Sequence, residues 1–265
     1  MFFLRNKPKV SIITVCYNSK KFIQFAIESI KKQEYKNWEL IIVNDCSNDS
    51  TKEILKKNKC NKIKIINLKK NVGPYKATSV ALKKATGKYV AILDSDDYSH
   101  SKRISSQVFE LEKNPKIGLV LTKYKLINEK NKIIKNIDFI SEKDFNKRFP
   151  CENLACNSSA MFRKKFVKDL TFYNSNYFYS CDYNFFLKIF AVSKIKLINK
   201  FYTFYRIHEN QRTNKLKAKI ILKENISHLF WSMNNGLINI NNLDLFLKRF
   251  IILNFKLLLE ILRLR

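Results

Sequence analysis

Short apolar runs that suit strands alternate with stretches that suit helices over the first half of the chain. Residues 10–17, 39–43 and 64–67 are rich in Ile, Val and Leu, and each run ends in a polar turn. Behind each turn lies a stretch with the apolar spacing or the first-turn charges of a helix. The pattern therefore predicts a repeating strand–helix unit.

Two more strands extend this pattern. The run 89–93 (YVAIL) is apolar throughout, as a strand covered on both faces should be, and it follows Gly87, which we predict to end the preceding helix. Another strand is predicted at 118–122. Alternating strands and helices predict an α/β fold with a doubly wound, mostly parallel sheet, which binds ligands beyond the carboxyl ends of its strands.

The alternation loosens beyond residue 123. Residues 123–137 suit a hairpin, 141–149 a short helix and 194–207 a strand, while 215–265 reads as helices. The last helix, within 245–265, is apolar apart from one narrow polar stripe. Such a helix packs on its own domain or lies in the plane of a membrane surface, and packing is the more common case. The polar stripe consists of Arg249, Lys256, Glu260 and Arg263.

An acidic turn follows the strand at 89–93. Asp94, Asp96 and Asp97 stand together where this strand leaves the core, and like charges so close repel one another. One interpretation is a solvated turn whose acids cap the next helix. The other is a site for Mg²⁺ or Mn²⁺, which bind carboxylate oxygens together with substrate phosphates.

Glycine is scarce, and its scarcity excludes some nucleotide sites. The chain has four glycines, so neither a G-x-G-x-x-G fingerprint nor a Walker A loop can form. Phosphates must then be neutralised in another way, and a metal held by acids at a strand end is one such way. Dehydrogenase and P-loop ATPase functions are accordingly disfavoured.

Charge and cysteine usage point to the chain's surroundings. The net charge of +29 favours an anionic partner, although the abundance of Lys together with Asn, Ile and Phe shows that part of this charge is compositional. Six cysteines without C-x-x-C spacing fit a reduced, cytoplasmic setting. We find neither a signal peptide nor an apolar stretch of about 18 residues, so we expect any membrane contact to be peripheral.

Two further side chains are candidates for chemistry. Asp182 stands at the head of an otherwise apolar helix, where it is either a helix cap or a general base whose apolar neighbours raise its pKa. His208 follows a predicted strand, and a single His there is more often a surface residue. The polar loop 209–214 (ENQRTN) that comes next could fold over a bound anion.

Taken together, seven segments resemble the family 2 glycosyltransferases, which are inverting bacterial enzymes of the GT-A fold that use nucleotide-diphosphate sugars. The resemblance implies a donor-binding half at 1–125, an acceptor-binding and catalytic half at 126–214, and a C-terminal helical extension at 215–265. It covers roughly residues 8–214. The segments are VSIITVCYN (10–18), WELIIVNDCSNDST (38–51), NVGPY (71–75), ATGKYVAILDSDDYSH (85–100), NSSAMFRK (157–164), SCDYNFFLKI (180–189) and YRIHENQRTN (205–214).

The resemblance also implies that the donor is a UDP-sugar and which residues bind it. Asp45 would hydrogen-bond the uracil and Asp94 would contact the ribose, above a nucleobase pocket formed at the end of the first strand by Thr14, Cys16 and Tyr17. The whole set implied for donor binding is Thr14, Cys16, Tyr17, Asn18, Asn44, Asp45, Lys76, Asp94 and Ser95.

For the reaction itself, the resemblance implies that Asp182 is the catalytic base. Asp96 would bind a divalent metal, Mn²⁺ or Mg²⁺, with Asp97 beside it, and His208 would complete the metal shell near the diphosphate. The implied acceptor is a hydroxyl of a glycan or a lipid-linked oligosaccharide in surface polysaccharide or lipo-oligosaccharide synthesis. The basic amphipathic end of the chain is compatible with such an acceptor at the inner face of the membrane.

The chain departs from the family pattern in three places. Asn44 replaces the first Asp of an Asp-Asp pair, and Cys181 replaces the Glu that usually precedes the base. Residues 78–79 are Thr-Ser where many members have Arg-Asn, which leaves Lys76 as the substitute cation.

Two other functions compete with glycosyl transfer. A sugar nucleotidyltransferase also joins an α/β sheet to metal-bound acids, but it usually has a glycine-rich loop after the first strand, which VCYNSKKF lacks. A basic nucleic-acid-binding protein would bind in a strongly salt-dependent manner. The aromatic residues here lie mostly within apolar periods, so we expect no nucleic-acid partner.

Overall fold

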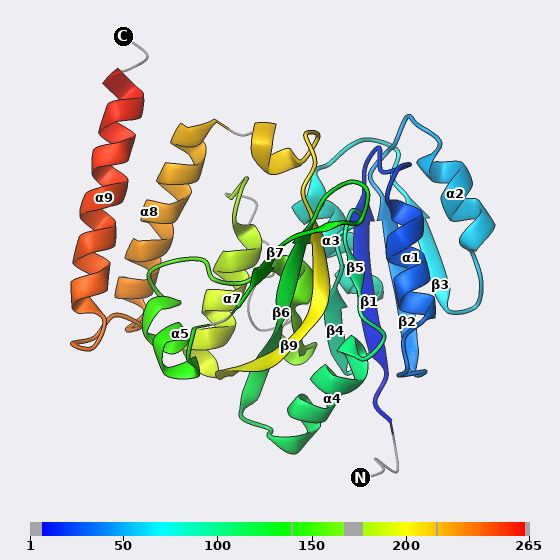
Figure 1. Ribbon diagram of the computed structural model, residues 1–265, viewed down its shortest axis with the longest axis horizontal. Coiled ribbons are helices and arrows are strands. Elements are labelled where there is room, and N and C mark those ends of the chain that lie inside the picture. Colours follow the sequence, from blue (N-terminus) through cyan, green and yellow to red (C-terminus); the bar gives the residue numbers. More distant parts are fainter. Residues whose placement is uncertain (1–6, 139, 167–176, 216, 263–265) are drawn as a thin grey trace.

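The computed structural model describes residues 7–138, 140–166, 177–215 and 217–262, which form one mixed sheet covered by helices (Figure 1). The strands are β1 (Val10–Cys16), β2 (Trp38–Asn44), β3 (Ile63–Asn67), β4 (Tyr89–Ile92), β5 (Tyr98–Ser99), β6 (Ile117–Ile127), β7 (Ile133–Ile137), β8 (Met161–Arg163) and β9 (Lys194–Arg206). The helices are α1 (Ile23–Lys31), α2 (Thr51–Asn58), α3 (Pro74–Lys84), α4 (Arg103–Lys113), α5 (Glu142–Arg148), α7 (Cys181–Val192), α8 (Ala218–Asn234) and α9 (Leu243–Leu262), with short 3-10 turns at η1 (Asn157–Ser159) and η2 (Arg212–Lys215).

The N-terminal half is the predicted doubly wound unit. The sheet order is β3-β2-β1-β4-β8-β6-β9-β5, and the first four of these strands pair in parallel. Apolar side chains of α1, α2 and α4 pack on one face of the sheet, and those of α3 and α7 pack on the other. Because both faces are covered, β1, β2 and β4 consist mostly of consecutive buried apolar residues rather than alternating ones.

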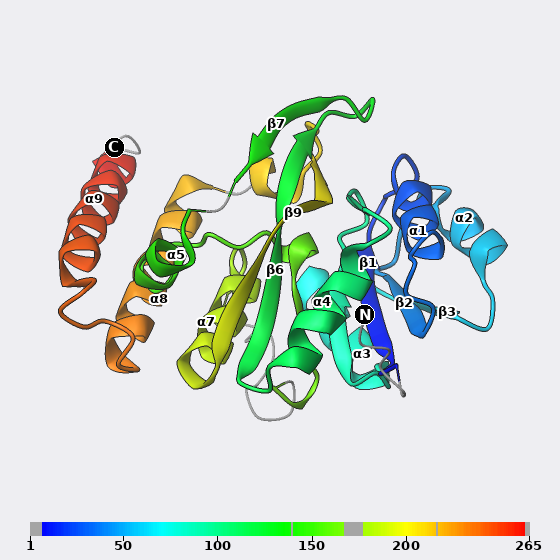
Figure 2. The same cartoon turned by 60° about the horizontal axis from the view of Figure 1, so that its bottom comes forward.

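The second half of the sheet is mixed. Strand β8 pairs antiparallel with both β4 and β6, whereas β6 and β9 run parallel. The fold class is confirmed, but parallel pairing is confined to the first four strands and to the β6–β9 pair. The strand expected at 118–122 continues to Ile127 and turns back through β7, which confirms the hairpin (Figure 2).

Gly87 has a different role from the predicted one. Helix α3 already ends at Lys84, with Ala85 as its C-cap, so Gly87 is not the residue that terminates it. A Cβ atom on Gly87 would lie 2.6 Å from the backbone nitrogen of Ser11 and 2.7 Å from the backbone oxygen of Lys9. The absence of a side chain therefore lets the start of β4 approach β1 closely.

Helices α8 and α9 lie side by side at the end of the molecule opposite α1 and α2 (Figure 1). They share a small apolar cluster that includes Leu229 of α8, Phe246 and Leu253 of α9, and Cys151. Among the described residues, no helix is both long enough and apolar enough to cross a membrane.

Candidate active site

The carboxyl ends of the parallel strands carry the acidic turn, and strand β9 brings His208 to it. Strand β5 follows the turn directly and pairs with β9, so that Ser99 lies opposite Thr203. Beyond the end of β9, the Nε2 atom of His208 lies 3.0 Å from Oδ2 of Asp96. Two residues that are 112 positions apart thus meet because the sheet places their strands together.

Asp94 lies at the opening of the turn and is partly exposed. Its carboxylate accepts a hydrogen bond from the amide of Asn157 at 3.0 Å, and its backbone N–H donates to the Ser158 hydroxyl at 3.0 Å. Burial, and next the charge of Asp96, raise the pKa of Asp94 to about 7. Neutral donors from η1 therefore hold this carboxylate, and no cation does so among the contacts described.

Asp97 points into the protein instead of toward the surface. It is 1% exposed, and its Oδ1 accepts the backbone N–H of Arg206 at 2.8 Å. Its Oδ2 has no hydrogen-bond partner among the described residues. Burial, followed by the charges of Asp96 and Asp94, raises the pKa of Asp97 well above its usual range.

Two fully buried arginines donate hydrogen bonds to the turn and to the residues around it. Arg206 donates from Nε to the backbone oxygen of Asp96 at 2.7 Å, and it reaches the β6–β7 turn at the Asn128 oxygen, 3.0 Å away. Arg103 donates to the Ser99 hydroxyl at 2.9 Å and to the Ile92 oxygen at 2.8 Å. The guanidinium groups of both arginines donate to backbone, hydroxyl and amide oxygens rather than to the carboxylates of the turn, although the arginine and carboxylate charges act on one another.

Asp182 enters the same region from the first turn of α7. Burial raises the pKa of Asp182 to about 6, while backbone N–H groups at the head of its helix and the charge of Arg212 act in the opposite direction. The Asp182 charge in turn contributes to the raised pKa of Asp94, which shows that the two carboxylates are within electrostatic reach. Asp182 thus has the first-turn position of a capping residue and the raised pKa expected of a base.

Arg212 is a site residue that the sequence did not single out. Its guanidinium lies over the ring of Tyr75, 4.9 Å from the centroid, and its charge acts on Asp182. The hydroxyl of Tyr75 donates to the backbone oxygen of Tyr179, just before α7. Only the polar character of the loop 209–214 hinted at this role.

The predicted nucleotide-side residues tie three loops together. Asp45 is buried, and its two carboxylate oxygens accept the backbone N–H groups of Val72 and Gly73 at 2.8 and 2.9 Å. The Asn44 side chain donates to Asn67 at 2.9 Å and accepts the Ser47 N–H at 3.1 Å. These bonds fix the loop before α3, and contact of either side chain with a nucleobase stays a prediction.

The end of β1 combines buried and exposed side chains. Thr14 and Cys16 are 2% and 1% exposed, and the Cys16 thiol donates to the Val43 oxygen, whereas Tyr17 is 49% exposed. Burial raises the pKa of Cys16 to about 12, so this thiol is not ionised near neutral pH. Of these three side chains, only that of Tyr17 is exposed enough to contact a nucleobase.

Three further predicted donor ligands lie around this edge. Asn18 has a positive φ of 50° and accepts the Asn48 N–H at 3.0 Å. The hydroxyl of Ser95 lies 2.9 Å from that of Ser19, which joins the acidic turn to the loop after β1. Lys76 is exposed on the first turn of α3.

The structure therefore brings Asp94, Asp96, Asp182 and His208 together at one edge and turns Asp97 inward. No three His, Cys, Asp or Glu side chains of the described residues form a group that could hold a metal ion unaided. The predicted set of Asp96, Asp97 and His208 thus supplies an Asp–His pair at the surface with a third, buried acid behind it.

Comparison with known proteins shows the family of the chain. Residues 11–171 match Glycosyl transferase family 2. The chain is 35% identical over 246 residues to the Escherichia coli UDP-Glc:alpha-D-GlcNAc-diphosphoundecaprenol beta-1,3-glucosyltransferase WfaP, covering 86% of this chain and 94% of that protein.

Solved structures show the same fold. Residues 1–349 of S. aureus TarS align with a TM-score of 0.70 and 22% identity, over 94% of this chain and 72% of that one. The same fragment in complex with UDP-GlcNAc aligns with a TM-score of 0.69 and 23% identity, over 83% and 66%. The mannosyltransferase PcManGT from Pyrobaculum calidifontis, in complex with GDP-Man and Mn²⁺, aligns with a TM-score of 0.66 and 16% identity, over 87% and 65%. The chain belongs to glycosyl transferase family 2 and is a glycosyltransferase of the GT-A fold.

Proposed function

We propose that this glycosyltransferase moves a sugar from a UDP-sugar to a hydroxyl group of a lipid-linked glycan, with inversion at the anomeric carbon and with Asp182 as the base. The observation that carries the proposal is the arrival of Asp182, from α7, beside the acidic turn after β4. Its charge acts on Asp94, and burial raises its own pKa to about 6. A carboxylate with such a pKa is ionised at pH 7 and is still basic enough to accept a proton.

The chemistry follows from these positions. Asp182 takes the proton of an acceptor hydroxyl while that oxygen forms a bond to the anomeric carbon. The bond between this carbon and the diphosphate oxygen breaks on the opposite face, and the nucleoside diphosphate leaves. General base catalysis of this kind contributes roughly 10²- to 10⁴-fold to a rate. The charge of Arg212, whose guanidinium lies over the ring of Tyr75, lowers the pKa of Asp182 and so favours the ionised form of the base.

The acidic turn fits a divalent cation. Asp97 has a buried carboxylate oxygen that has no hydrogen-bond partner in the part of the chain that the structure describes, and the pKa values of Asp94 and Asp97 are raised by burial and by neighbouring acids. Asp96 and His208 would hold Mn²⁺ or Mg²⁺ together with diphosphate oxygens, which suits cations that bind one or two protein groups plus phosphates. When bound, the metal supplies positive charge for the leaving diphosphate.

The donor and the acceptor are proposed by analogy with relatives. The name of WfaP specifies UDP-Glc and a GlcNAc-diphosphoundecaprenol acceptor, and TarS was solved with UDP-GlcNAc. By this analogy Asp45 and Tyr17 would lie on the nucleobase side of the donor, and Asp94 on the ribose side. Exposed Tyr17 is the side chain of this group that is free to stack on a base.

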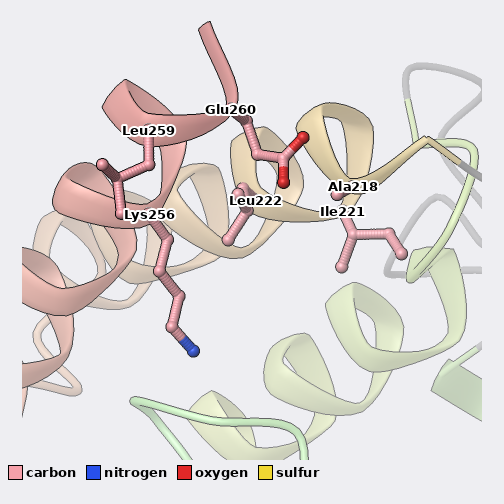
Figure 3. A pocket seen from close by; sticks show the side chains of 6 residues that line it. All are labelled: Ala218, Ile221, Leu222, Lys256, Leu259 and Glu260. Atoms are coloured by element: carbon pink, nitrogen blue, oxygen red, sulfur yellow. The ribbon is translucent and has the colours of Figure 1, made fainter. Parts of the chain in front are cut away.

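A lipid-linked acceptor requires contact with a membrane surface, and we propose that α9 provides it. One face of α9 packs on the protein through Phe246 and Leu253, and the opposite face is apolar and exposed. A groove of about 300 Å³ separates α9 from α8 near the Lys256 end, lined by Leu222 of α8 and Leu259 of α9 among others (Figure 3). The exposed apolar side chains are Leu247, Ile251, Phe255, Leu258 and Leu262.

The polar stripe of α9 is compatible with this orientation. Arg249 forms an ion pair with Glu152 at 3.4 Å on the inner side, so the apolar side chains are the ones that face outward. With a net charge of +29, the protein is attracted to anionic lipid. Arg263 lies outside the described residues.

Donor binding is the first test. We expect UDP-hexoses, but not UMP, to raise the melting temperature in the presence of Mn²⁺, and the UDP-sugar with the largest effect to donate to a synthetic GlcNAc-diphospholipid. Donor binding that is fully independent of metal would contradict the metal assignment. If no UDP-sugar but GDP-Man binds, the nucleotide assignment is wrong.

Membrane contact is tested with vesicles. We expect the protein to float with vesicles that contain anionic lipid, and the variant Ile251→Glu/Phe255→Glu to float at least tenfold less. The matched control is Ile133→Glu/Ile134→Glu, which places the same charge at two exposed apolar positions of β7. Equal flotation of all three proteins would exclude α9 as the contact.

A further inference from the structure

Helix α8 holds the main chain that leads into the catalytic helix. Residues 177–180 directly precede α7, whose first turn carries Asp182. Two polar side chains of α8 lie against this segment and are almost fully buried, Glu224 at 7% exposure and His228 at 1%. Neither residue lies within residues 11–171, which match the family model, and the transfer chemistry described above uses neither.

The Glu224 carboxylate collects the N–H groups of three consecutive residues. Its Oε2 accepts the backbone N–H of Tyr179 and that of Ser180, both at 2.9 Å, and also the Ser180 hydroxyl at 3.0 Å. Its Oε1 accepts the N–H of Phe178. Successive N–H groups that converge on one point form an anion site, and here the anion is a side chain of another helix.

His228 extends this network to a ring nitrogen. Its Nε2 lies 2.7 Å from the Ser180 hydroxyl, and the single proton of that hydroxyl goes to Glu224, so Nε2 must be the donor. Burial lowers the pKa of His228 to about 4, which leaves the ring neutral at pH 7. Tyr177 stacks on the ring with centroids 4.5 Å apart.

We propose that Glu224 is a positioning residue for glycosyl transfer, which fixes the backbone of residues 178–180 and thereby the place of Asp182 in the site. The inference rests on the proposed role of Asp182 as the base. Through Glu224, the C-terminal extension takes part in the reaction. Glu224 also provides an acid close to Cys181, which stands where the resemblance to the family implies a Glu.

The charged groups around Asp182 set its pKa, so a change in Glu224 should shift that pKa. Glu224 raises the pKa of Asp182, and Arg212 lowers it. Asp94, from the acidic turn, is the other carboxylate that is coupled to Asp182. Three other titratable groups of the described residues feel the charge of Asp182, and they are neutral at pH 7 because their ordinary pKa values already lie above 7 and burial raises them further. They are Tyr75, Tyr179 and Cys181.

The test is the variant Glu224→Gln, which keeps one acceptor oxygen and removes the charge. We expect kcat to fall roughly tenfold because the base is less well placed. The acid limb of the kcat profile should move to lower pH, since the loss of a nearby negative charge lowers the pKa of the base. KM for the UDP-sugar should stay unchanged. A residue that only stabilises the fold would lower kcat without moving this limb, and that result would overturn the proposal.

A second readout does not depend on activity. Hydrogen exchange of the amides of 178–180 should accelerate at least tenfold in Glu224→Gln, and exchange that equals that of the wild type would overturn the clamp. The control Asp244→Asn removes one acidic group from exposed α9 and should change neither readout. If the wild-type protein transfers no sugar, the proposed function fails, and the exchange measurement still decides whether Glu224 holds this segment.

Discussion

The buried carboxylate of Glu39 and the carboxylates of the acidic turn lie at opposite ends of the parallel strands, and their pKa values are shifted in opposite directions. Glu39, near the start of β2, accepts hydrogen bonds from Lys64 at 2.9 Å, from Ser11 at 2.7 Å and from the backbone N–H of Thr86 at 2.8 Å. Burial alone would raise the pKa of Glu39, but these donors outweigh it and hold the pKa far below the ordinary range.

At the other end of the sheet, the acids lack such partners. Asp94 and Asp97 have raised pKa values, caused first by burial and next by the charge of Asp96, and the guanidinium groups of the buried Arg103 and Arg206 donate to other oxygens. A fully paired acid such as Glu39 stabilises a fold, whereas crowded acids without a direct Lys or Arg ion pair among the described residues cost stability and persist where they bind something. The contrast locates the function at the carboxyl edge without reference to any relative.

The substitution with the largest expected effect replaces the proposed catalytic base, Asp182. Asp182→Asn should reduce sugar transfer by roughly 10²- to 10⁴-fold, because the amide cannot accept the acceptor proton. UDP-sugar affinity, measured by calorimetry with Mn²⁺, should remain within about twofold of the wild-type value, since Asp182 acts on the acceptor side.

Asp138→Asn is the matched control, because Asp138 is exposed and pairs only with Lys123 among the ion pairs described. It should retain wild-type transfer. Native transfer rates in Asp182→Asn would remove Asp182 from the mechanism and leave the raised pKa as a result of burial alone.

The sequence predicts those parts of the fold whose signals are local. Each strand–helix unit up to residue 113 has its own apolar run, turn and helix signals, so the N-terminal half is predictable. The antiparallel placement of β8 is not, because three residues carry too little pattern to show direction. Gly87 is similar: its sequence position suggests a helix end, while its actual role depends on the distance to β1.

For the site, the acids were predictable and their supports were not. Asp94, Asp96, Asp182 and His208 stand in recognisable segments. Arg206, however, supports Asp97 from 109 residues away, and nothing in a lysine-rich chain distinguishes it from a surface cation. Glu224 likewise acts on a segment 44 residues earlier. Such roles arise only when the sheet and the helices are assembled.

The second prediction concerns Glu39, the fully hydrogen-bonded acid near the start of β2. Glu39→Gln should lower the free energy of unfolding by about 2–3 kcal/mol. The substitution removes the buried, hydrogen-bonded negative charge that pairs with Lys9 and Lys64. Urea denaturation measures this loss. Since the folded-state pKa of Glu39 lies below its ordinary 4.5, its contribution is present above pH 4.5 and is lost as the pH falls further, so the difference between the two proteins should narrow in acid.

Glu53→Gln is the control for this change. Glu53 is exposed in the first turn of α2, and its substitution should alter stability by no more than about 0.5 kcal/mol. Equal losses for both variants would mean that the hydrogen bonds of Glu39 contribute little, and the contrast between the two ends would then weaken.

The smallest expected effect has the opposite sign. Asp96→Asn should raise the free energy of unfolding by about 1 kcal/mol in the absence of metal, because the charge of Asp96 is a cause of the raised pKa of both Asp94 and Asp97. The same variant should lose the additional stabilisation that Mn²⁺ gives with a UDP-sugar. Melting curves with and without these ligands measure both effects on one protein. A variant that is less stable than the wild type without metal would show that Asp96 is a structural acid like Glu39, held by its contact with His208. A gain in stability together with loss of the Mn²⁺ effect would show that this carboxylate is kept for its ligand at a cost to the fold.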